Sequence, residues 1–524
     1  MKGKILTKVT LLAALMCASV TGCNFNKNKL KLVEDDPYTF TSNHRNLRIN
    51  GNGYSAEQYT DNTKTLKDGT VGHNYVISDV KALVVPVDFE DYPASIFGSE
   101  ENSLGLIRNA VFGEKSDTKW YSLKEYYASS SFGQCKISGT VLPWYRYNKK
   151  VSEIDKTKTA TSTDIATKIQ DYYREHPDIV NLADYDANKD GYVDSLIMIY
   201  SAPINPGKAG DSGLWWAYCW SIPGAWGKYT PAGDMIGVSR YFWASMHFLF
   251  DKGQNKYATA AEIATGTLKP DSHTLVHEFG HVLSLPDYYI TDYSSTDYAA
   301  LGGLDMMDYN IGDHNIYSKM MYGWVNPRRV TGTKGKVTVD LKSATTTGDA
   351  IIIPAPGEWN DTYLDQYLTI EFLTPEGVAE SDGKAPYVEG WSKYYGTAGI
   401  RILHIDSRMG SFSSSSFLGY SWTTTRQDKS SYIDIAADNT ASRSAFPAYK
   451  LAEIMPATGK YQRQRQRDAD DSCLYKEGDS FGMNGIFEDF KFNSIDGTVT
   501  KEFGFKIHVD KINGNESATI TISR

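Results

Sequence analysis

The segment 273–289, HTLVHEFGHVLSLPDYY, constrains the fold of this chain more than any other stretch. It holds three of the chain's ten histidines, at intervals of four residues. Side chains four residues apart lie one above the other on a helix, so the spacing predicts a helix over 273–284. His277 and His281 then share one face, and Glu278 projects beside them toward the same cleft.

Two imidazoles one helical turn apart can bind one Zn²⁺, and an adjacent carboxylate that is not a ligand can take a proton from a metal-bound water. This HExxH pattern is typical of zinc peptidases. His273 lies too far along the helix to share the same metal. A catalytic zinc has three protein ligands and one open position, so a third ligand is expected. A glutamate on a later helix is a poor choice, because the next glutamate after Glu278 is Glu358.

The segment resembles the metzincin pattern, HExxHxxGxxH or HExxHxxGxxD. The resemblance makes Asp287, in the last position of the pattern, the third zinc ligand. Metzincins also have a Met-containing turn beneath the metal. GGLDMMDYN at 302–310 corresponds to it, with Met307 as the best match and Met306 as the alternative. Tyr309 takes the place of a tyrosine that several metzincins keep near the metal, where it would stabilise a developing oxyanion.

One position departs from this pattern, because Ser284 stands where the pattern has Gly. The Gly lets the chain turn sharply out of the helix, so that the third ligand can swing back. A residue with a Cβ in such a left-handed turn costs about 1–2 kcal/mol. The turn is therefore either strained or made in another way, with Pro286 contributing, and the position of the third ligand depends on which applies.

HEFGHVLSLPDYY, GGLDMMDYN and NIYSKMMYGWVNP together resemble the immune inhibitor A family of secreted bacterial zinc endopeptidases. The family's pattern is HEFGHxLGLPDxY, then a WDLM-like turn, then a helix leading into a GW dipeptide. The matching positions here are 277–289, 304–307 and Gly323-Trp324, with Leu304 in place of the usual Trp. Weaker similarity extends over roughly residues 80–410. The resemblance implies cleavage of proteins, dependence on zinc and stabilisation by calcium.

The segment DANKDGYVD at 186–194 suggests a calcium site. Oxygen ligands at alternate positions, followed by a glycine that permits a tight turn, suit Ca²⁺. The pattern is not a complete EF-hand, because Ile197 stands where a bidentate glutamate is required. A calcium site and an Asx-rich surface turn are therefore both open readings. The calcium ligands would be Asp186, Asn188, Asp190 and Asp194.

The N-terminus predicts export. Three lysines precede an apolar run over 9–20, which ends in VTGC at Cys23. This is typical of a signal peptide over 1–23, and the small residues before the cysteine resemble a bacterial lipobox, in which that cysteine is lipidated. Residues 24–79 are polar and read as a tether or short pro-segment without an assigned fold. We therefore expect a protein held by its lipid at the bilayer, on the extracellular face of a bacterial envelope.

The rest of the chain shows two different patterns of expected secondary structure. Strands interleaved with helices up to about residue 330 predict an α+β unit, and alternating, β-branched segments beyond Pro327 predict a β-rich region. A net charge of −9 offers no basic surface for nucleic acid. The expected fold is a zincin/metzincin-like catalytic domain over 80–330, built from a twisted sheet and an active-site helix, followed by a β-rich C-terminal region over 331–524.

These features predict a zinc-dependent endopeptidase acting on proteins or peptides. His277, His281 and Asp287 would hold Zn²⁺, and Glu278 would act as the general base for the attacking water. An alternative is a surface lipoprotein with a binding role and a structural or inactive zinc site, although such a site needs no base. A zinc hydrolase acting on a non-peptide bond is a further alternative.

Overall fold

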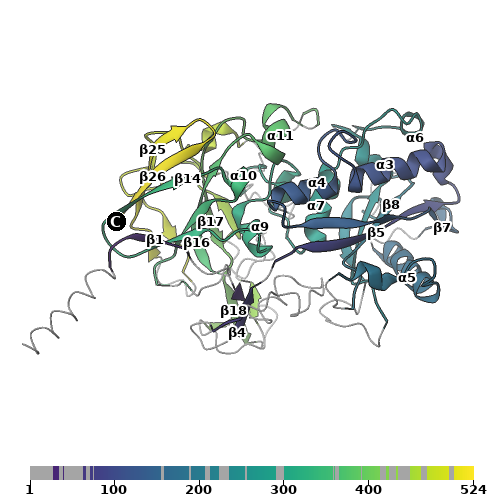
Figure 1. Cartoon of the computed structure of the whole chain (residues 1–524), viewed down its shortest axis with the longest axis horizontal. Coiled ribbons are helices and arrows are strands. Elements are labelled where there is room, and N and C mark those ends of the chain that lie inside the picture. Colours follow the sequence, from purple (N-terminus) through teal and green to yellow (C-terminus); the bar gives the residue numbers. More distant parts are fainter. Residues whose placement is uncertain are drawn as a thin grey trace, which may run out of the picture.

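The computed structural model places two groups of sheets along the long axis of the molecule (Figure 1). Within the described parts of the chain, no helix has the length and apolar character needed to cross a bilayer. The structure describes residues 28–34, 39–40, 63–65, 71–74, 76–154, 159–187, 191–206, 213–222, 235–253, 256–290, 300–357, 359, 365–386, 388–390, 392–413, 421–423, 432–434, 439, 449–461, 469–494 and 501–524.

A mixed sheet forms the first half of the fold (Figure 1). Its strand order is β6-β5-β8-β10-β9, and β7 also pairs with β5. The pairings are parallel except the last, where β9 runs antiparallel to β10 at the edge. The strands are β5 (Asp79–Phe89), β6 (Lys136–Val141), β7 (Tyr145–Tyr147), β8 (Ser195–Tyr200), β9 (Tyr218–Ser221) and β10 (Arg240–Ser245).

Helices cover both faces of this sheet, as its apolar strands require. Successive side chains of β5 point to opposite faces: Val84 packs toward α3, α4 and α7, whereas Leu83 and Val85 pack toward α5. The helices are α3 (Glu100–Phe112), α4 (Leu123–Ser130), α5 (Ala160–Glu175) and α7 (His273–Val282). The helix expected over 273–284 corresponds to α7, which ends two residues earlier, at Val282.

Beyond the first half of the fold, most strands belong to two stacked sheets. A six-stranded sheet has the order β1-β13-β15-β16-β17-β21, and a four-stranded sheet has the order β14-β26-β25-β22. Ile370 and Ile402 of the first sheet share a core with Ile507 and Ile520 of the second. The strands are β1 (Lys31–Val33), β13 (Arg328–Thr331), β14 (Lys336–Leu341), β15 (Ala350–Pro354), β16 (Gln366–Leu373), β17 (Gly399–Asp406), β21 (Ala452–Ile454), β22 (Ser480–Gly482), β25 (Lys506–Asn513) and β26 (Ser517–Ser523).

The other face of the six-stranded sheet packs toward the first half of the molecule. Tyr367, Leu403 and Ile405 belong to the same buried cluster as Val276 and Phe279 of α7. This explains why β16 and β17 are buried along their whole length, since a sheet covered on both faces has no solvent-facing side. Residue 330 therefore marks a change of secondary structure, but the hydrophobic core continues across it.

Short elements connect these sheets. The helices are α6 (Ala260–Ile263), α8 (Met306–Tyr309), α9 (Ile316–Met321), α10 (Ala344–Thr347) and α11 (Glu380–Lys384), with single 3₁₀ turns η2 (Ala94–Phe97), η3 (Val151–Glu153), η4 (Leu182–Tyr185), η5 (Met246–Phe250), η6 (Gly377–Ala379) and η8 (Asp471–Cys473). The small sheets are β2 (Thr39–Phe40), β3 (Thr63–Thr65) and β4 (Val71–Asn74); β11 (Asp251–Gly253) and β12 (Lys256–Tyr257); β18 (Met409–Ser413), β19 (Ser421–Thr423) and β20 (Tyr432–Asp434); and β23 (Lys491–Phe492) and β24 (Lys501–Glu502).

Part of the segment 24–79, which the sequence reading left without a fold, belongs to the C-terminal sheets. β1 pairs antiparallel with β13, with Leu32 opposite Val330. Leu30, just before the strand, is buried in the core between the two stacked sheets. The expected signal peptide and Cys23 lie outside the described residues.

A buried ion cluster joins the start of α7 to the C-terminal region. His273 is 1% exposed, and the ring of Trp120 stacks on it at a centroid distance of 3.7 Å. Its Nδ1 donates to Asp271 Oδ1 at 2.6 Å, and its Nε2 lies 3.2 Å from Asp382 Oδ1. Asp382, in α11, also accepts the backbone N–H of Gly312 at 2.7 Å. Burial would lower the pKa of His273, but the two carboxylates raise it to about 9.

We expect Asp382→Asn to lower the free energy of unfolding by about 2 kcal/mol near pH 6.5 and by clearly less near pH 9.5. The folded-state pKa of His273 lies above its unfolded value of ~6.5, so the stabilisation by Asp382 is complete below that pH and is lost as the pH rises through about 9. Urea unfolding of the purified protein at both pH values measures the difference. Glu380→Gln, on the exposed side of the same helix, is the control. Equal deficits at the two pH values would mean that His273 is not charged.

Candidate metal centre

The helix α7 is held by its apolar face, which turns its histidine face toward the rest of the site. Leu275, Val276, Phe279 and Val282 are buried in the core. The helix ends at Val282, and the backbone N–H of Ser284 donates to the carbonyl oxygen of His281 at 2.9 Å. Ser284 has a φ of 81°, so the turn out of the helix takes the left-handed conformation that the pattern's Gly would favour. Of the two readings of this turn, the structure shows the strained one.

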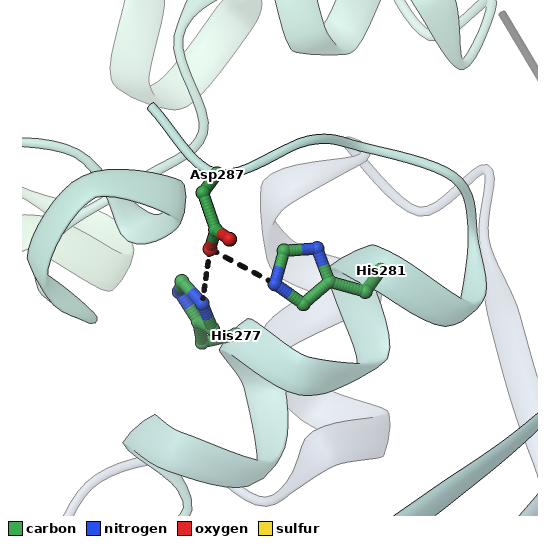
Figure 2. A group of neighbouring side chains, drawn as sticks. All are labelled: His277, His281 and Asp287. Atoms are coloured by element: carbon green, nitrogen blue, oxygen red, sulfur yellow. Dashed lines mark ion pairs between the residues drawn. The ribbon is translucent and has the colours of Figure 1, made fainter. Parts of the chain in front are cut away.

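This turn brings Asp287 back over the two histidines (Figure 2). Its Oδ1 lies 3.0 Å from His281 Nε2 and 3.2 Å from His277 Nε2. One potential ligand atom from each of the three residues lies within 4.8 Å of the others, and this is the one such His/Cys/Asp/Glu group found among the described residues. Two imidazole nitrogens and a carboxylate oxygen are a donor set that suits Zn²⁺.

Backbone carbonyls fix the orientation of both imidazoles. His277 Nδ1 lies 2.8 Å from the carbonyl oxygen of Met306, and His281 Nδ1 lies 2.8 Å from that of Leu285. A carbonyl can only accept, so each Nδ1 carries a proton and donates it. Each Nε2 is thereby directed toward Asp287, and in the neutral tautomer its lone pair points there. Metal-binding histidines are commonly oriented in this way.

The charges of the cluster favour a bound cation. Burial would raise the pKa of Asp287, but His281 and His277 hold it well below its ordinary range. Burial would lower the pKa of His281, whereas the Asp287 carboxylate raises it to about 9. The site therefore stabilises positive charge beside Asp287. A divalent cation would supply that charge in place of a proton and would release the proton on binding.

Glu278 lies next to this cluster with an unused oxygen. Its side chain is buried, and its Oε2 has no hydrogen-bond partner among the described residues. Burial raises the pKa of Glu278 above its ordinary value, while the two histidines and a hydrogen bond from the backbone of Cys219 act in the opposite direction. A buried carboxylate with a free oxygen can accept a proton from a molecule bound in the cluster.

The contact with Cys219 places Glu278 at the outer side of β9, which is the last strand of the first sheet among the described residues. Ile222 donates its backbone N–H to Ser239 across the β9–β10 pairing at 3.0 Å. In an antiparallel pair, every second residue of a strand directs its backbone N–H and C=O toward the partner strand. Trp220 and Tyr218 therefore also direct these groups toward β10, whereas Cys219 and Ser221 direct theirs away from it. The outer edge of β9 thus runs past the carboxylate of Glu278.

The turn around Met306 and Met307 lies directly beneath α7. The carbonyl of Met306 holds His277, and a Cβ added at Gly280 would come within 2.4 Å of Met307 Sδ. The Met307 sulfur therefore fills the space left by the missing side chain of Gly280, between the two histidines. Asp305 accepts the backbone N–H of Met307 at 2.9 Å and so orders the turn. Tyr309 ends α8 and is half-buried.

Sequence reasoning did not single out two other residues of the site. The ring of Tyr289 lies almost parallel to that of His277, at a centroid distance of 6.2 Å. Arg240, from β10, donates to the carbonyl oxygen of His281 at 2.6 Å. The position of Tyr289 two residues after Asp287 was a usable clue, whereas nothing in the local sequence around Arg240 pointed to the helix.

The candidate calcium segment is only partly described. Asn188 and Asp190 lie outside the described residues. Asp186 accepts the backbone N–H of Gly191 at 2.9 Å, and Asp194 accepts that of Lys81 at 2.7 Å and that of Ala187 at 3.2 Å. These bonds are those of an Asx-rich turn, and the calcium reading stays a prediction.

Comparison with known proteins gives weak similarity to a named metalloprotease and to an immune inhibitor. No family model matches the chain. The chain is 26% identical over 244 residues to the pre-pro-metalloprotease PrtV of Vibrio cholerae serotype O1, and 22% identical over 251 residues to immune inhibitor A of Bacillus thuringiensis subsp. alesti. Each match covers 40% of this chain, but only 25% and 34% of the respective relative. The chain thus matches about a quarter of the length of the first relative and about a third of the length of the second.

Proposed function

We propose that this chain is a zinc-dependent endopeptidase that hydrolyses peptide bonds in proteins. The observation that carries the proposal is the convergence of His277 Nε2, His281 Nε2 and Asp287 Oδ1, beside Glu278 Oε2, which has no hydrogen-bond partner in the described part of the chain. The similarity to a named metalloprotease supports the same conclusion. We further propose that the fold is zincin/metzincin-like and related to immune inhibitor A.

Each residue has a defined role in this proposal. His277, His281 and Asp287 would hold Zn²⁺, which when bound supplies the Lewis acidity that activates water and polarises a carbonyl. Glu278 accepts the proton of the attacking water and returns it to the leaving nitrogen. Burial, which raises the pKa of Glu278, brings it closer to the working pH of such a base. Tyr309 would stabilise the oxyanion.

The edge of β9 favours a peptide as the substrate. The backbone carbonyl of Cys219 and the outward backbone groups of Ser221 can pair with an extended chain, as exposed sheet edges do when they bind peptides. Because Cys219 also contacts Glu278, a chain paired there would pass beside the proposed base. This arrangement supports hydrolysis of a peptide bond more than of a small ester or amide.

Two further parts of the proposal rest on the sequence. Calcium bound near Asp186 and Asp194 would stabilise the enzyme. Lipidation of Cys23 would display it on the outer face of a bacterial envelope.

Metal removal tests the central proposal. We expect the purified protein to contain one zinc per chain by elemental analysis and to cleave casein. Dialysis against a chelator should abolish cleavage, and one equivalent of Zn²⁺ should restore it, because the ligands and the base persist in the metal-free fold. Stoichiometric zinc without cleavage of any protein would overturn the endopeptidase and favour the structural-zinc alternative.

A further inference from the structure

The turn from His281 to Asp287 connects two of the three proposed metal ligands. The backbone conformation of its central residue, Ser284, is unfavourable. Ser284 adopts a φ of 81°, a left-handed conformation that glycine accepts more readily. The same turn contains Leu285, whose carbonyl holds the ring of His281. Any movement of this turn would therefore displace Asp287 and rotate His281 together.

Arg240 supports the turn from the neighbouring strand. Its Nη1 donates to the carbonyl oxygen of His281 at 2.6 Å and to Ser284 Oγ at 3.2 Å. Arg240 begins β10, where it pairs with Ser221 of β9, so its backbone is part of the sheet. A cation at the last carbonyls of α7 is also favourable for the helix dipole. One guanidinium thus links the end of the helix, the strained residue and the rigid sheet.

We propose that Arg240 and Ser284 form a positioning pair that sets the turn between His281 and Asp287 and thereby the affinity for the metal. The Ser284 hydroxyl accepts a hydrogen bond that glycine could not accept, which offsets the unfavourable backbone conformation. Arg240 contacts the backbone carbonyl of His281 and the hydroxyl of Ser284, so the pair acts on the proposed ligands through the turn. The inference rests on the proposed zinc site, but it does not require that the site be a peptidase.

Zinc affinity, measured by competition with a chromophoric chelator, tests this pair. We expect Arg240→Met to weaken zinc binding about 10–100-fold, as loss of a supporting contact does in other metal sites, and Arg240→Lys to recover part of it. Ser284→Ala keeps the strained conformation without the hydroxyl and should weaken binding several-fold. Ser284→Gly loses the hydroxyl but accepts the conformation, and should bind nearly as tightly as the unmodified protein.

The double variant shows whether the two residues act together. With Gly at 284, Arg240→Met should cost less in zinc affinity than it does with Ser at 284, because part of the turn no longer needs support. Additive losses would overturn the pair. A purely structural role would lower the melting temperature of Arg240→Met and leave the zinc dissociation constant of the folded protein unchanged, which would also overturn the proposal.

The proposal can also be tested if one of the variants fails to fold. If Arg240→Met does not fold, Arg240→Lys and the contrast between Ser284→Ala and Ser284→Gly give the answer, and equal zinc affinity in all three would reject the proposal. Casein cleavage by the unmodified protein is recorded in parallel. Absence of cleavage together with the expected affinity pattern would reject the peptidase and retain the positioning pair.

Discussion

Glu278→Gln should lose casein cleavage by about 10²–10⁴-fold while still binding one zinc per chain. The amide is close in size to the carboxylate but cannot accept a proton from the attacking water. Glu278 Oε2 has no hydrogen-bond partner among the described residues, so the substitution removes no packing contact that the fold needs from that atom. Initial rates with and without added Zn²⁺, together with elemental analysis, give both quantities.

The appropriate control is Glu101→Gln, an exposed glutamate on α3, which should leave cleavage and zinc content unchanged. Undiminished proteolysis by Glu278→Gln would reject Glu278 as the base. Loss of zinc in the same variant would instead place Glu278 among the ligands and require a different base.

Asp287→Ala should weaken zinc binding by more than the roughly 10–100-fold that loss of a supporting contact costs, and should abolish cleavage. The substitution removes the oxygen that lies 3.0 Å and 3.2 Å from the two Nε2 atoms. It also removes the carboxylate that raises the pKa of His281 to about 9, so the metal-free variant should take up less proton charge at neutral pH. Metal content after dialysis and histidine titration by NMR measure the two effects.

The double change His277→Ala, His281→Ala should show the largest loss of zinc among these variants, with none left after dialysis. Asp178→Ala, at an exposed position, is the matched control for the loss of one carboxylate. If Asp287→Ala keeps stoichiometric, tightly bound zinc, the third ligand lies elsewhere and the resemblance to the metzincin pattern fails at that position.

Much of the secondary structure could be predicted from local patterns. Continuous apolar runs such as DSLIMIYSAP and alternating segments such as SATITIS became β8 and β26, because burial on one or both faces determines which residues a strand can carry. The strand at Lys31–Val33 could not be found in this way. It is short and partly exposed, and its partner β13 lies about 300 residues further along the chain.

The residues of the candidate site were predictable where the chemistry is local. His277, Glu278, His281 and Asp287 occur within eleven positions of sequence, so spacing and family resemblance bring them together. The residues that hold this segment in place come from distant parts of the chain. Arg240 reaches the end of α7 from β10, and Asp382 reaches its start from α11. Such contacts depend on the tertiary fold and have no signature in a single sequence.

The pairing of β1 with β13 bears on how far the proposed enzyme stands from a membrane. The described chain enters the fold at Asn28, only five positions after Cys23. Five extended residues reach at most about 18 Å. A lipid on Cys23 would therefore hold the C-terminal sheets close to the bilayer. The long tether expected over residues 24–79 would not separate them from it. β1 lies at the end of the molecule away from α3 and α5 (Figure 1). The C-terminal sheets would therefore lie between the bilayer and α7, and α7 would stand at a distance from the membrane where soluble proteins can reach it.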